Sequence, residues 1–429
     1  MGARIITSVI AFALCAELIA LAAYYVDTGA LFYTHRKTYA DPLPTPGDRL
    51  VVREAVHPYF GFTHAPGTPF EIPESLRAPG AAPAALTTNN FGFVSPHAYP
   101  FRKTGSNQVV VGLFGGSVGV WFCQVGAPRL VDRLTQQAYF RDKEIVPLCF
   151  SHEGYKQPQQ ALVLAYFLSI GQAFDLVVNI DGFNDVALAA LNTGRGLESS
   201  MPSVQHMDPL VAIINQSALT PEKLASLAAI VNGRQRLTER LDRIRSNRIA
   251  AVNLVLERLY QRELDRYVRE LGRFSNLPSN PPENALVQVA PADTGASHGV
   301  PFSTIAANWT AASLLMRDML AARGAAYVHF LQPNQYDTRR RFSDAEAAVA
   351  LSEASPYKNS VEQGYPAMRD AARSQLAPRQ VAFFDATHVF DAEPAPVYMD
   401  NCCHYTLVGN HRLADFVAAS ILRTPGPWR

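Results

Sequence analysis

The sequence has almost no excess charge of either sign. Its 429 residues include 38 Lys and Arg against 37 Asp and Glu, which leaves a formal net charge of +1. It also lacks internal repeats and long runs of like charge, and 48% of it is hydrophobic. A nucleic-acid partner normally requires a strongly basic surface, so none is expected. The length suits one large domain or two smaller ones.

Cysteine is scarce, and no two cysteines form a C-x-x-C pair. That spacing is typical of structural zinc sites, so its absence argues against one. Cys15 lies in an apolar N-terminal segment, whereas Cys123, Cys149, Cys402 and Cys403 allow three disulfide pairings. The adjacent Cys402 and Cys403 are poor partners for each other on geometric grounds. Small buried thiols are the alternative to disulfides.

A glycine-rich stretch, GLFGGSVGV at 112–120, lacks the pattern of a nucleotide-binding loop. A Walker loop needs a lysine after its last glycine, and a dinucleotide loop needs G-x-G-x-x-G. We therefore expect no nucleotide cofactor. Two interpretations remain: a tight turn after a strand, or a corner that presents Ser117 as a nucleophile at a helix N-terminus. The second interpretation requires partner residues elsewhere in the chain.

Only the N-terminus has an apolar run long enough to cross a bilayer, at 5–25. Glu17 near its middle costs roughly 3 kcal/mol on insertion scales. Nine strongly apolar residues offset this by about 0.3–0.6 kcal/mol each, so insertion is close to balance. Residues 20–22 (ALA) also fit a signal-peptide cleavage site. We favour an uncleaved anchor over residues 1–27, and either alternative exports the rest of the chain.

Strand-like and helix-like segments alternate beyond residue 107. The strands are expected at 109–114, 144–150, 174–180, 325–331 and 381–385, and the helices at 129–139, 158–170, 185–191, 308–323 and 406–422. Continuous apolar strands that alternate with helices favour a parallel sheet covered on both faces. We therefore predict an α/β domain over 108–429, with a three-layer α/β/α sandwich and a mainly parallel sheet.

Three further segments interrupt this alternation. Residues 28–107 are expected to form an irregular lead-in, rich in proline and glycine. A helical insertion is predicted at about 205–275, and its interleaved charges indicate a solvated face rather than a binding site. Residues 276–301, rich in Pro, Gly and Ser, are expected to form a loop.

Polar residues follow the predicted strands. Ser117 follows the first strand, Gly154 the second and Asn184 the third, while Asp400 and His404 lie near the C-terminus. Sites in α/β sheets form at the carboxyl ends of the strands. Together these residues could form an acyl-transfer site, with His404 as base and Asp400 orienting its imidazole. The N–H groups of Ser117 and Gly154 and the Asn184 amide would form the oxyanion hole.

Each candidate also has a purely structural explanation. Asn184 could cap the helix that follows it, and Gly154 could serve only a turn. Asp400 could be a cap or a surface charge, and His404 a hydrogen-bonded structural histidine. His152 is expected to be structural or substrate-facing. Asp181 and Asp185 look like a metal pair, but no further ligands lie nearby in the sequence, so no metal is expected.

Four short blocks resemble those of the SGNH (GDSL-type) hydrolase superfamily in residues and order: GGS at 115–117, Gly154, GFND at 182–185, and His404 with Gly409 and Asn410. Gly116 replaces the aspartate usual in the first block. The resemblance spans about 109–422 without the helical insertion. The stretches GYKQPQQ and NIDGFND suggest a bacterial branch with an N-terminal membrane segment.

One departure from the family concerns the acid. The family usually has aspartate three residues before the histidine, whereas Asp400 lies four before His404. The extra residue could bulge out and leave a triad intact. Alternatively, a Ser–His dyad could use a backbone carbonyl. Asp385 and Asp391 are remoter candidates for the acid.

The resemblance implies an SGNH/flavodoxin-like fold and a serine esterase or O-acyltransferase that acts through a Ser117 acyl-enzyme. The implied substrate is an acylated carbohydrate or small ester, with acetyl groups of an envelope or exported polysaccharide favoured. An inactive glycan-binding or assembly component, and a lipase or thioesterase, are the alternatives. The expected location is the bacterial inner membrane, single-pass, with the site facing the periplasm or the outside; secretion after cleavage is the alternative.

Overall fold

The computed structural model describes residues 2–34, 54–78, 85–207, 220–278 and 299–429. The chain divides into two compact units, one formed by residues 1–51 and 211–288 and the other by residues 52–210 and 289–429. Most of the loop predicted at 276–301 lies outside the described residues, as does part of the lead-in. Residues 211–275, which are most of the predicted helical insertion, therefore belong to the unit of the N-terminal helix, and not to the unit that contains the rest of the domain predicted over 108–429.

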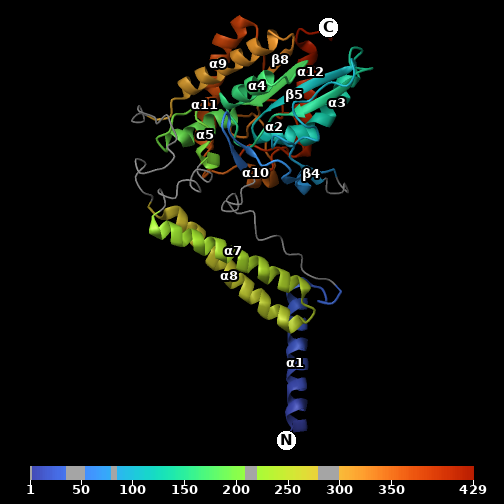
Figure 1. The fold of residues 1–429 in the computed structure, drawn as a ribbon, viewed down its shortest axis with the longest axis vertical. Helices are drawn as coiled ribbons and strands as arrows, with labels where there is room; N and C mark the ends of the chain where they lie inside the picture. Colours follow the sequence, from blue (N-terminus) through green and yellow to red (C-terminus); the bar gives the residue numbers. More distant parts are fainter. Residues whose placement is uncertain (1, 35–53, 79–84, 208–219, 279–298) are drawn as a thin grey trace. The chain divides into compact units, whose positions relative to one another are not determined.

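Five parallel strands form the sheet of the second unit (Figure 1). They are β5 (Gln108–Gly115), β6 (Glu144–Cys149), β7 (Leu176–Asp181), β8 (Ala326–Leu331) and β9 (Ala382–Asp385). Their order is β6-β5-β7-β8-β9, so the direction of winding reverses at β5. Every residue of β5 and β7 is buried, as expected for parallel strands covered on both faces. The predicted α/β class with a parallel sheet is confirmed.

The helices of this unit pack in two groups. Helix α12 (Leu407–Arg423) packs on α3 (Ala127–Thr135), and α9 (Phe302–Ala321) packs on α4 (Gln159–Ser169), α5 (Phe183–Thr193) and α11 (Lys358–Ala371). Trp309 of α9 is fully buried in the core. The shorter α2 (Ser117–Trp121) and a π-helical turn (Phe122–Gly126) lead into α3, and α10 spans Asp344–Ala350. No helix was predicted from the sequence at α2, α10 or α11.

The lead-in contains regular structure that the sequence analysis did not predict. Strands β1 (Glu54–His57) and β2 (Gly61–His64) pair antiparallel, as do β3 (Pro69–Glu71) and β4 (Ala85–Thr87). The prediction of an irregular segment over 28–107 is therefore wrong for these residues. Each strand has only three or four residues, too few for a pattern. Aromatic side chains of this segment join the main hydrophobic core: Phe60, Phe62, Phe93 and Tyr99.

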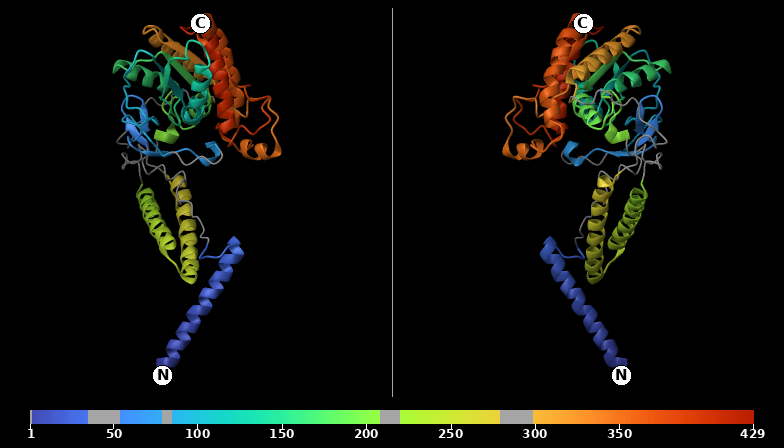
Figure 2. Two further views of the ribbon diagram at one scale, coloured as in Figure 1. Left: turned by 90° about the vertical axis from the view of Figure 1, so that its right-hand side faces the viewer. Right: turned by 90° about the vertical axis from the view of Figure 1, so that its left-hand side faces the viewer.

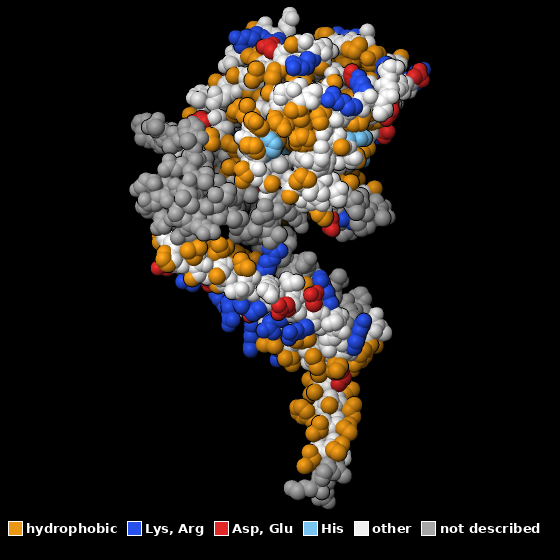
Figure 3. Space-filling model, viewed as in Figure 1, with side chains coloured by type: hydrophobic (Ala, Val, Ile, Leu, Met, Phe, Trp, Pro, Cys, Tyr) orange, Lys and Arg blue, Asp and Glu red, His pale blue; other side chains and the backbone are white. Residues whose placement is uncertain are grey.

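The first unit contains a helical hairpin of α7 (Pro221–Ser246) and α8 (Ala250–Asn276), which run side by side (Figures 1 and 2). Their buried contact is apolar and spaced at helical period: Ile230, Leu237, Leu241 and Ile244 on α7, and Tyr260 and Tyr267 on α8. Lys and Arg side chains gather on the surface of these helices (Figure 3). The hairpin is therefore held by its apolar stripe, and most of its charged side chains face solvent, whereas Glu263 is buried beside Arg236.

Helix α1 (Gly2–Thr28) is long and apolar enough over Ile5–Thr28 to cross a membrane, a property that signal sequences share. Hydrophobic side chains cover it (Figure 3). The Glu17 carboxylate accepts the backbone N–H groups of Ala250 (2.7 Å) and Ala251 (2.9 Å), and Tyr33 donates its hydroxyl to the same group. The charge that interrupts the apolar segment thus satisfies two N–H groups at the start of α8, which have no partner within their own helix.

Candidate active site

Ser117 lies at the corner between β5 and α2. It is the first residue of α2, so its N–H has no acceptor within the helix. Gly116 precedes it, and a Cβ there would lie 2.2 Å from Asn184 Nδ2. Only glycine allows the backbone and the asparagine amide to come this close. A larger residue would not fit at this position without a shift of Asn184.

His404 and Asp400 lie on a closed loop before α12. An antiparallel bridge joins Tyr398 to Tyr405, and the Met399 N–H donates to the His404 carbonyl at 3.1 Å. The Asp400 Oδ1 atom accepts the N–H groups of Cys402 (2.9 Å), Cys403 (3.0 Å) and His404 (3.2 Å). The loop therefore folds around the aspartate side chain, and this turn accommodates the extra residue between Asp400 and His404.

Ser117, His404 and Asp400 form one hydrogen-bonded chain. Ser117 Oγ lies 2.7 Å from His404 Nε2, and His404 Nδ1 lies 2.5 Å from Asp400 Oδ2. Burial alone would lower the pKa of His404, but the hydrogen bond and charge of Asp400 raise it above the ordinary 6.5. Burial would raise the pKa of Asp400, but its hydrogen bonds, above all with His404, lower it. Asp400 is therefore an ionised acceptor that favours the imidazolium.

The remoter aspartates have other partners. Asp385 accepts the Thr387 N–H, and Asp391 accepts the Thr338 hydroxyl. The structure thus brings Asp400, rather than either of these, to the imidazole.

Gly154 and Asn184 lie on the loops after β6 and β7. Gly154 has a φ of +78°, and a Cβ there would lie 2.3 Å from the His206 ring. Its N–H has no backbone acceptor among the described residues. Asn184 Nδ2 donates to the Tyr155 carbonyl (2.8 Å) on the same loop as Gly154. Asn184 is the second residue of α5, whose N-cap is Gly182, so capping does not explain it.

Asp185 ties these two loops together. Its Oδ1 accepts the Gln157 N–H at 2.7 Å, and its Oδ2 accepts the Gly182 N–H at 3.1 Å. Burial raises the pKa of Asp185 and lowers that of nearby Lys156. Asp181 is saturated as well, because Trp309 (2.7 Å) and His329 (2.8 Å) both donate to its Oδ1. These two aspartates hold loops and core, and no metal is needed to explain them.

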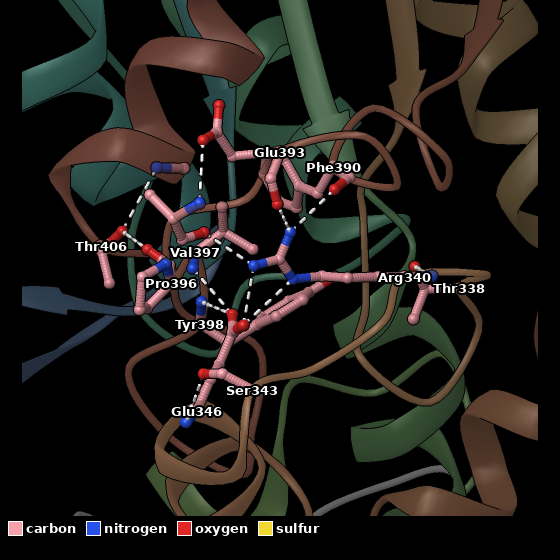
Figure 4. Close-up of polar contacts among 12 residues, drawn as sticks. Thr338, Arg340, Ser343, Glu346, Phe390, Glu393, Pro396, Val397, Tyr398 and Thr406 are labelled. Carbon is pink, nitrogen blue, oxygen red and sulfur yellow. Dashed lines mark hydrogen bonds and ion pairs between the residues drawn. The ribbon is translucent and has the colours of Figure 1, made fainter.

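A buried ion pair fixes the segment that leads to Asp400 (Figure 4). Arg340 Nη2 lies 2.7 Å from Glu346 Oε2, and each side chain is only 1% exposed. Arg340 also donates to the carbonyls of Phe390 and Ala395. The other Glu346 oxygen accepts the N–H groups of Val397 and Tyr398. Both charges thus bind the backbone between Phe390 and Tyr398, which is the segment that leads to Asp400.

Histidines cluster next to Gly154, which the sequence analysis did not predict. His206 Nδ1 lies 2.7 Å from Glu54, and its ring stacks on Phe62. His152 is fully buried and its Nδ1 bonds to the Glu153 carbonyl. Burial lowers the pKa of His152 to about 3, with His64 adding to the shift, so it is neutral at physiological pH. His152 is therefore structural rather than substrate-facing.

Two groups among the described residues have ligand atoms close enough for a metal ion. The first is His64, His152 and Glu153, in which His64 Nε2 already pairs with the Glu153 carboxylate at 3.0 Å. The second is Cys402, Cys403 and His404, in which both His404 nitrogens are hydrogen-bonded within the Ser117 chain. Hydrogen bonds within the protein thus engage part of each group, whereas His152 Nε2 is buried without a hydrogen-bond partner among the described residues.

Comparison with known proteins does not identify the site. No protein-family model matches the chain, and no curated protein matches its sequence. The arrangement itself combines a serine hydroxyl, a base hydrogen-bonded to it, a carboxylate that orients the base, and N–H donors nearby. Such a set can transfer a proton from the serine and stabilise an oxyanion.

Proposed function

We propose that the chain is a serine esterase or O-acyltransferase of SGNH type. The observation that carries the proposal is the unbroken chain of hydrogen bonds from Ser117 through His404 to Asp400. Ser117 follows β5 and Asn184 follows β7, and the winding of the sheet reverses between these neighbouring strands; such points favour ligand sites. The strand order is that of flavodoxin-like sheets and supports the three-layer α/β/α arrangement proposed for this unit.

The proposed reaction forms an acyl-enzyme. Ser117 Oγ attacks the acyl carbon while its proton passes to His404 Nε2, and Asp400 stabilises the imidazolium. The N–H groups of Ser117 and Gly154 and the Asn184 amide hold the oxyanion; each such donor is worth roughly 3–4 kcal/mol of barrier. His404 then returns the proton to the leaving alcohol. Water or a sugar hydroxyl takes up the acyl group in the second half of the reaction.

We propose that the site works outside the cytoplasm, on acyl groups of an envelope or exported polysaccharide. The apolar α1 supports export, with a single-pass anchor favoured over a cleaved signal. The Cys123–Cys149 disulfide is a second support, because such bonds persist in oxidising compartments. Acetylated carbohydrate as substrate rests on this location and on the resemblance to the family.

The test is labelling of the full chain in detergent with a fluorophosphonate, followed by mapping of the adduct. We expect the adduct on Ser117, and its loss in Ser117→Ala but not in Ser169→Ala, an exposed serine at the end of α4. A folded protein that gains no adduct would point instead to a non-catalytic glycan-binding component. Faster hydrolysis of long-chain than of short-chain esters would favour a lipase or thioesterase.

A further inference from the structure

Two adjacent cysteines lie inside the loop that joins Asp400 to His404. Their Sγ atoms are 3.6 Å apart, and neither is in a disulfide. Cys403 is buried, and burial raises the pKa of its thiol. Cys402 is half-buried and therefore the more accessible thiol. The proposed reaction assigns no role to either sulfur atom.

The peptide between these cysteines is held at both of its ends. Its carbonyl, from Cys402, accepts a hydrogen bond from Asn334 Nδ2 at 3.1 Å. Its N–H, from Cys403, donates to Asp400 Oδ1 at 3.0 Å. The other oxygen of the Asp400 carboxylate bonds to His404. The orientation of this single peptide is therefore coupled to the orientation of the carboxylate that holds the imidazole.

We propose that Cys402 and Cys403 form a thiol–disulfide site that switches the Ser117–His404–Asp400 chain off when oxidised. The oxidant is a small organic disulfide of the glutathione disulfide class. The Cys402 thiolate attacks one sulfur of the oxidant and releases one small thiol. Cys403 then gives up its thiol proton, attacks the Cys402 sulfur and expels the second small thiol, which carries that proton away. The two protein thiols lose two electrons and two protons, and the oxidant takes them up as two thiols.

Formation of the Cys402–Cys403 disulfide must move the peptide between the two cysteines. The sulfur atoms have to approach to about 2.05 Å, while disulfide-linked Cα atoms usually lie about 4.4–6.8 Å apart. Adjacent Cα atoms are only about 3.8 Å apart, so the ring closes only if the intervening peptide is distorted. That distortion turns the Cys403 N–H away from Asp400. Strained disulfides are also the easily reduced ones, which makes the change reversible.

The Cys123–Cys149 pair provides an internal comparison. Cys123 and Cys149 have their Cα atoms 5.7 Å apart, within the ordinary range for a disulfide. We expect this bond to persist in redox buffers that oxidise and reduce the Cys402–Cys403 pair.

The experiment uses full-length protein in detergent carrying Cys15→Ser, equilibrated in buffers of glutathione and glutathione disulfide. Peptide mapping reports the loss of two hydrogens from the Cys402–Cys403 peptide, and fluorophosphonate reports Ser117 in the same samples. We expect labelling to slow about tenfold or more as the bond forms, and to recover on reduction. Either a bond that leaves labelling unchanged or a glutathione adduct as the only product would overturn the proposal.

Two variants and a second readout complete the test. Neither Cys402→Ser nor Cys403→Ser can form the Cys402–Cys403 disulfide, and both variants keep every backbone N–H. The labelling rate of each variant should therefore not respond to the glutathione ratio. The effect on labelling rests on the proposed function, whereas amide hydrogen exchange at residues 400–404 does not. If reduced protein gains no adduct, the proposed function fails, but faster exchange on oxidation would still support the switch. Unchanged exchange with the bond formed would overturn it.

Discussion

The two units of the chain differ in how deeply their ion pairs are buried. The sheet unit contains an ion pair in which both charged groups are buried and bonded to backbone, that of Arg340 with Glu346. In the helical hairpin, the arginine of each described ion pair is exposed, as in the pair of Arg273 with Glu270, although Glu263 is buried. Surface pairs contribute little to stability, whereas breaking a buried pair is costly. The sheet unit therefore uses polarity to position loops, and the hairpin depends on its apolar stripe.

The sharpest contrast should come from His404→Ala, which removes the base from the candidate site. We expect fluorophosphonate labelling of Ser117 to fall by about 10²–10⁴-fold, because the serine loses its proton acceptor. The hairpin should be untouched, and hydrogen exchange over residues 221–276 should match the parent protein. Labelling that persists at the parent rate would mean that Ser117 is activated by something other than this histidine.

Arg340→Met should cost the sheet unit about 3–5 kcal/mol, because it leaves Glu346 buried without its counter-charge. Urea unfolding followed by tryptophan fluorescence measures this. All three tryptophans, Trp121, Trp309 and Trp428, lie in the sheet unit. The neighbouring Arg341 is exposed, so Arg341→Met serves as the matched control with little effect. If Arg340→Met and Arg341→Met lower the free energy of unfolding equally, burial of the charge does not determine its contribution to stability.

Leu237→Ala should affect the helical hairpin rather than the sheet unit. Leu237 is fully buried in the apolar stripe of the hairpin, so truncation should destabilise it by about 2–5 kcal/mol. Val231 on the same helix is 58% exposed, and Val231→Ala is the control. Hydrogen exchange in α7 and α8 should rise in the first variant alone. A simultaneous loss of Ser117 labelling would show that the two units are energetically coupled.

Glu17→Ala should have a smaller effect, about 0.5–2 kcal/mol, of the size found for the loss of a helix cap. The variant strips the acceptor from the Ala250 and Ala251 N–H groups. We expect faster exchange of these two amides, with an intermediate rate in Glu17→Gln, which keeps one oxygen. Unchanged exchange in both variants would show that the carboxylate does not hold the start of α8.

The pH profile should show the smallest change, a shift rather than a loss. His404 accepts the serine proton only when neutral, and Asp400 raises the pKa of its imidazole above 6.5. Labelling should therefore decline as the pH falls through that raised pKa. Asp400→Asn removes the negative charge, so it should lower the pKa of His404 and move the acid limb to lower pH. If the acid limb of Asp400→Asn stays at the same pH as in the parent protein, a group other than His404 is responsible for the decline in labelling.

Much of the sheet and its polar edge was predictable because the signals are local. Apolar runs such as 109–114 and 174–180 correspond to β5 and β7, and Ser117 and Asn184 follow them directly. The lead-in strands were not predictable, because they are three or four residues long and their aromatic residues pack against distant segments. The histidine cluster was not predictable for the same reason, because Glu54 and His206 lie far apart in the sequence and come into contact only in the fold.

The sequence by itself determined the α/β class, the parallel sheet, the apolar N-terminal helix and the residue types at the strand ends, since all of these depend on periodicity and composition within short windows. Only the tertiary structure decided that Asp400, rather than Asp385 or Asp391, bonds to His404. It also decided that Cys123 pairs with Cys149 and that Glu17 holds the start of α8. Each of these depends on distances between atoms that the chain brings together from separate segments or through the shape of a loop, and residue spacing carries no such information.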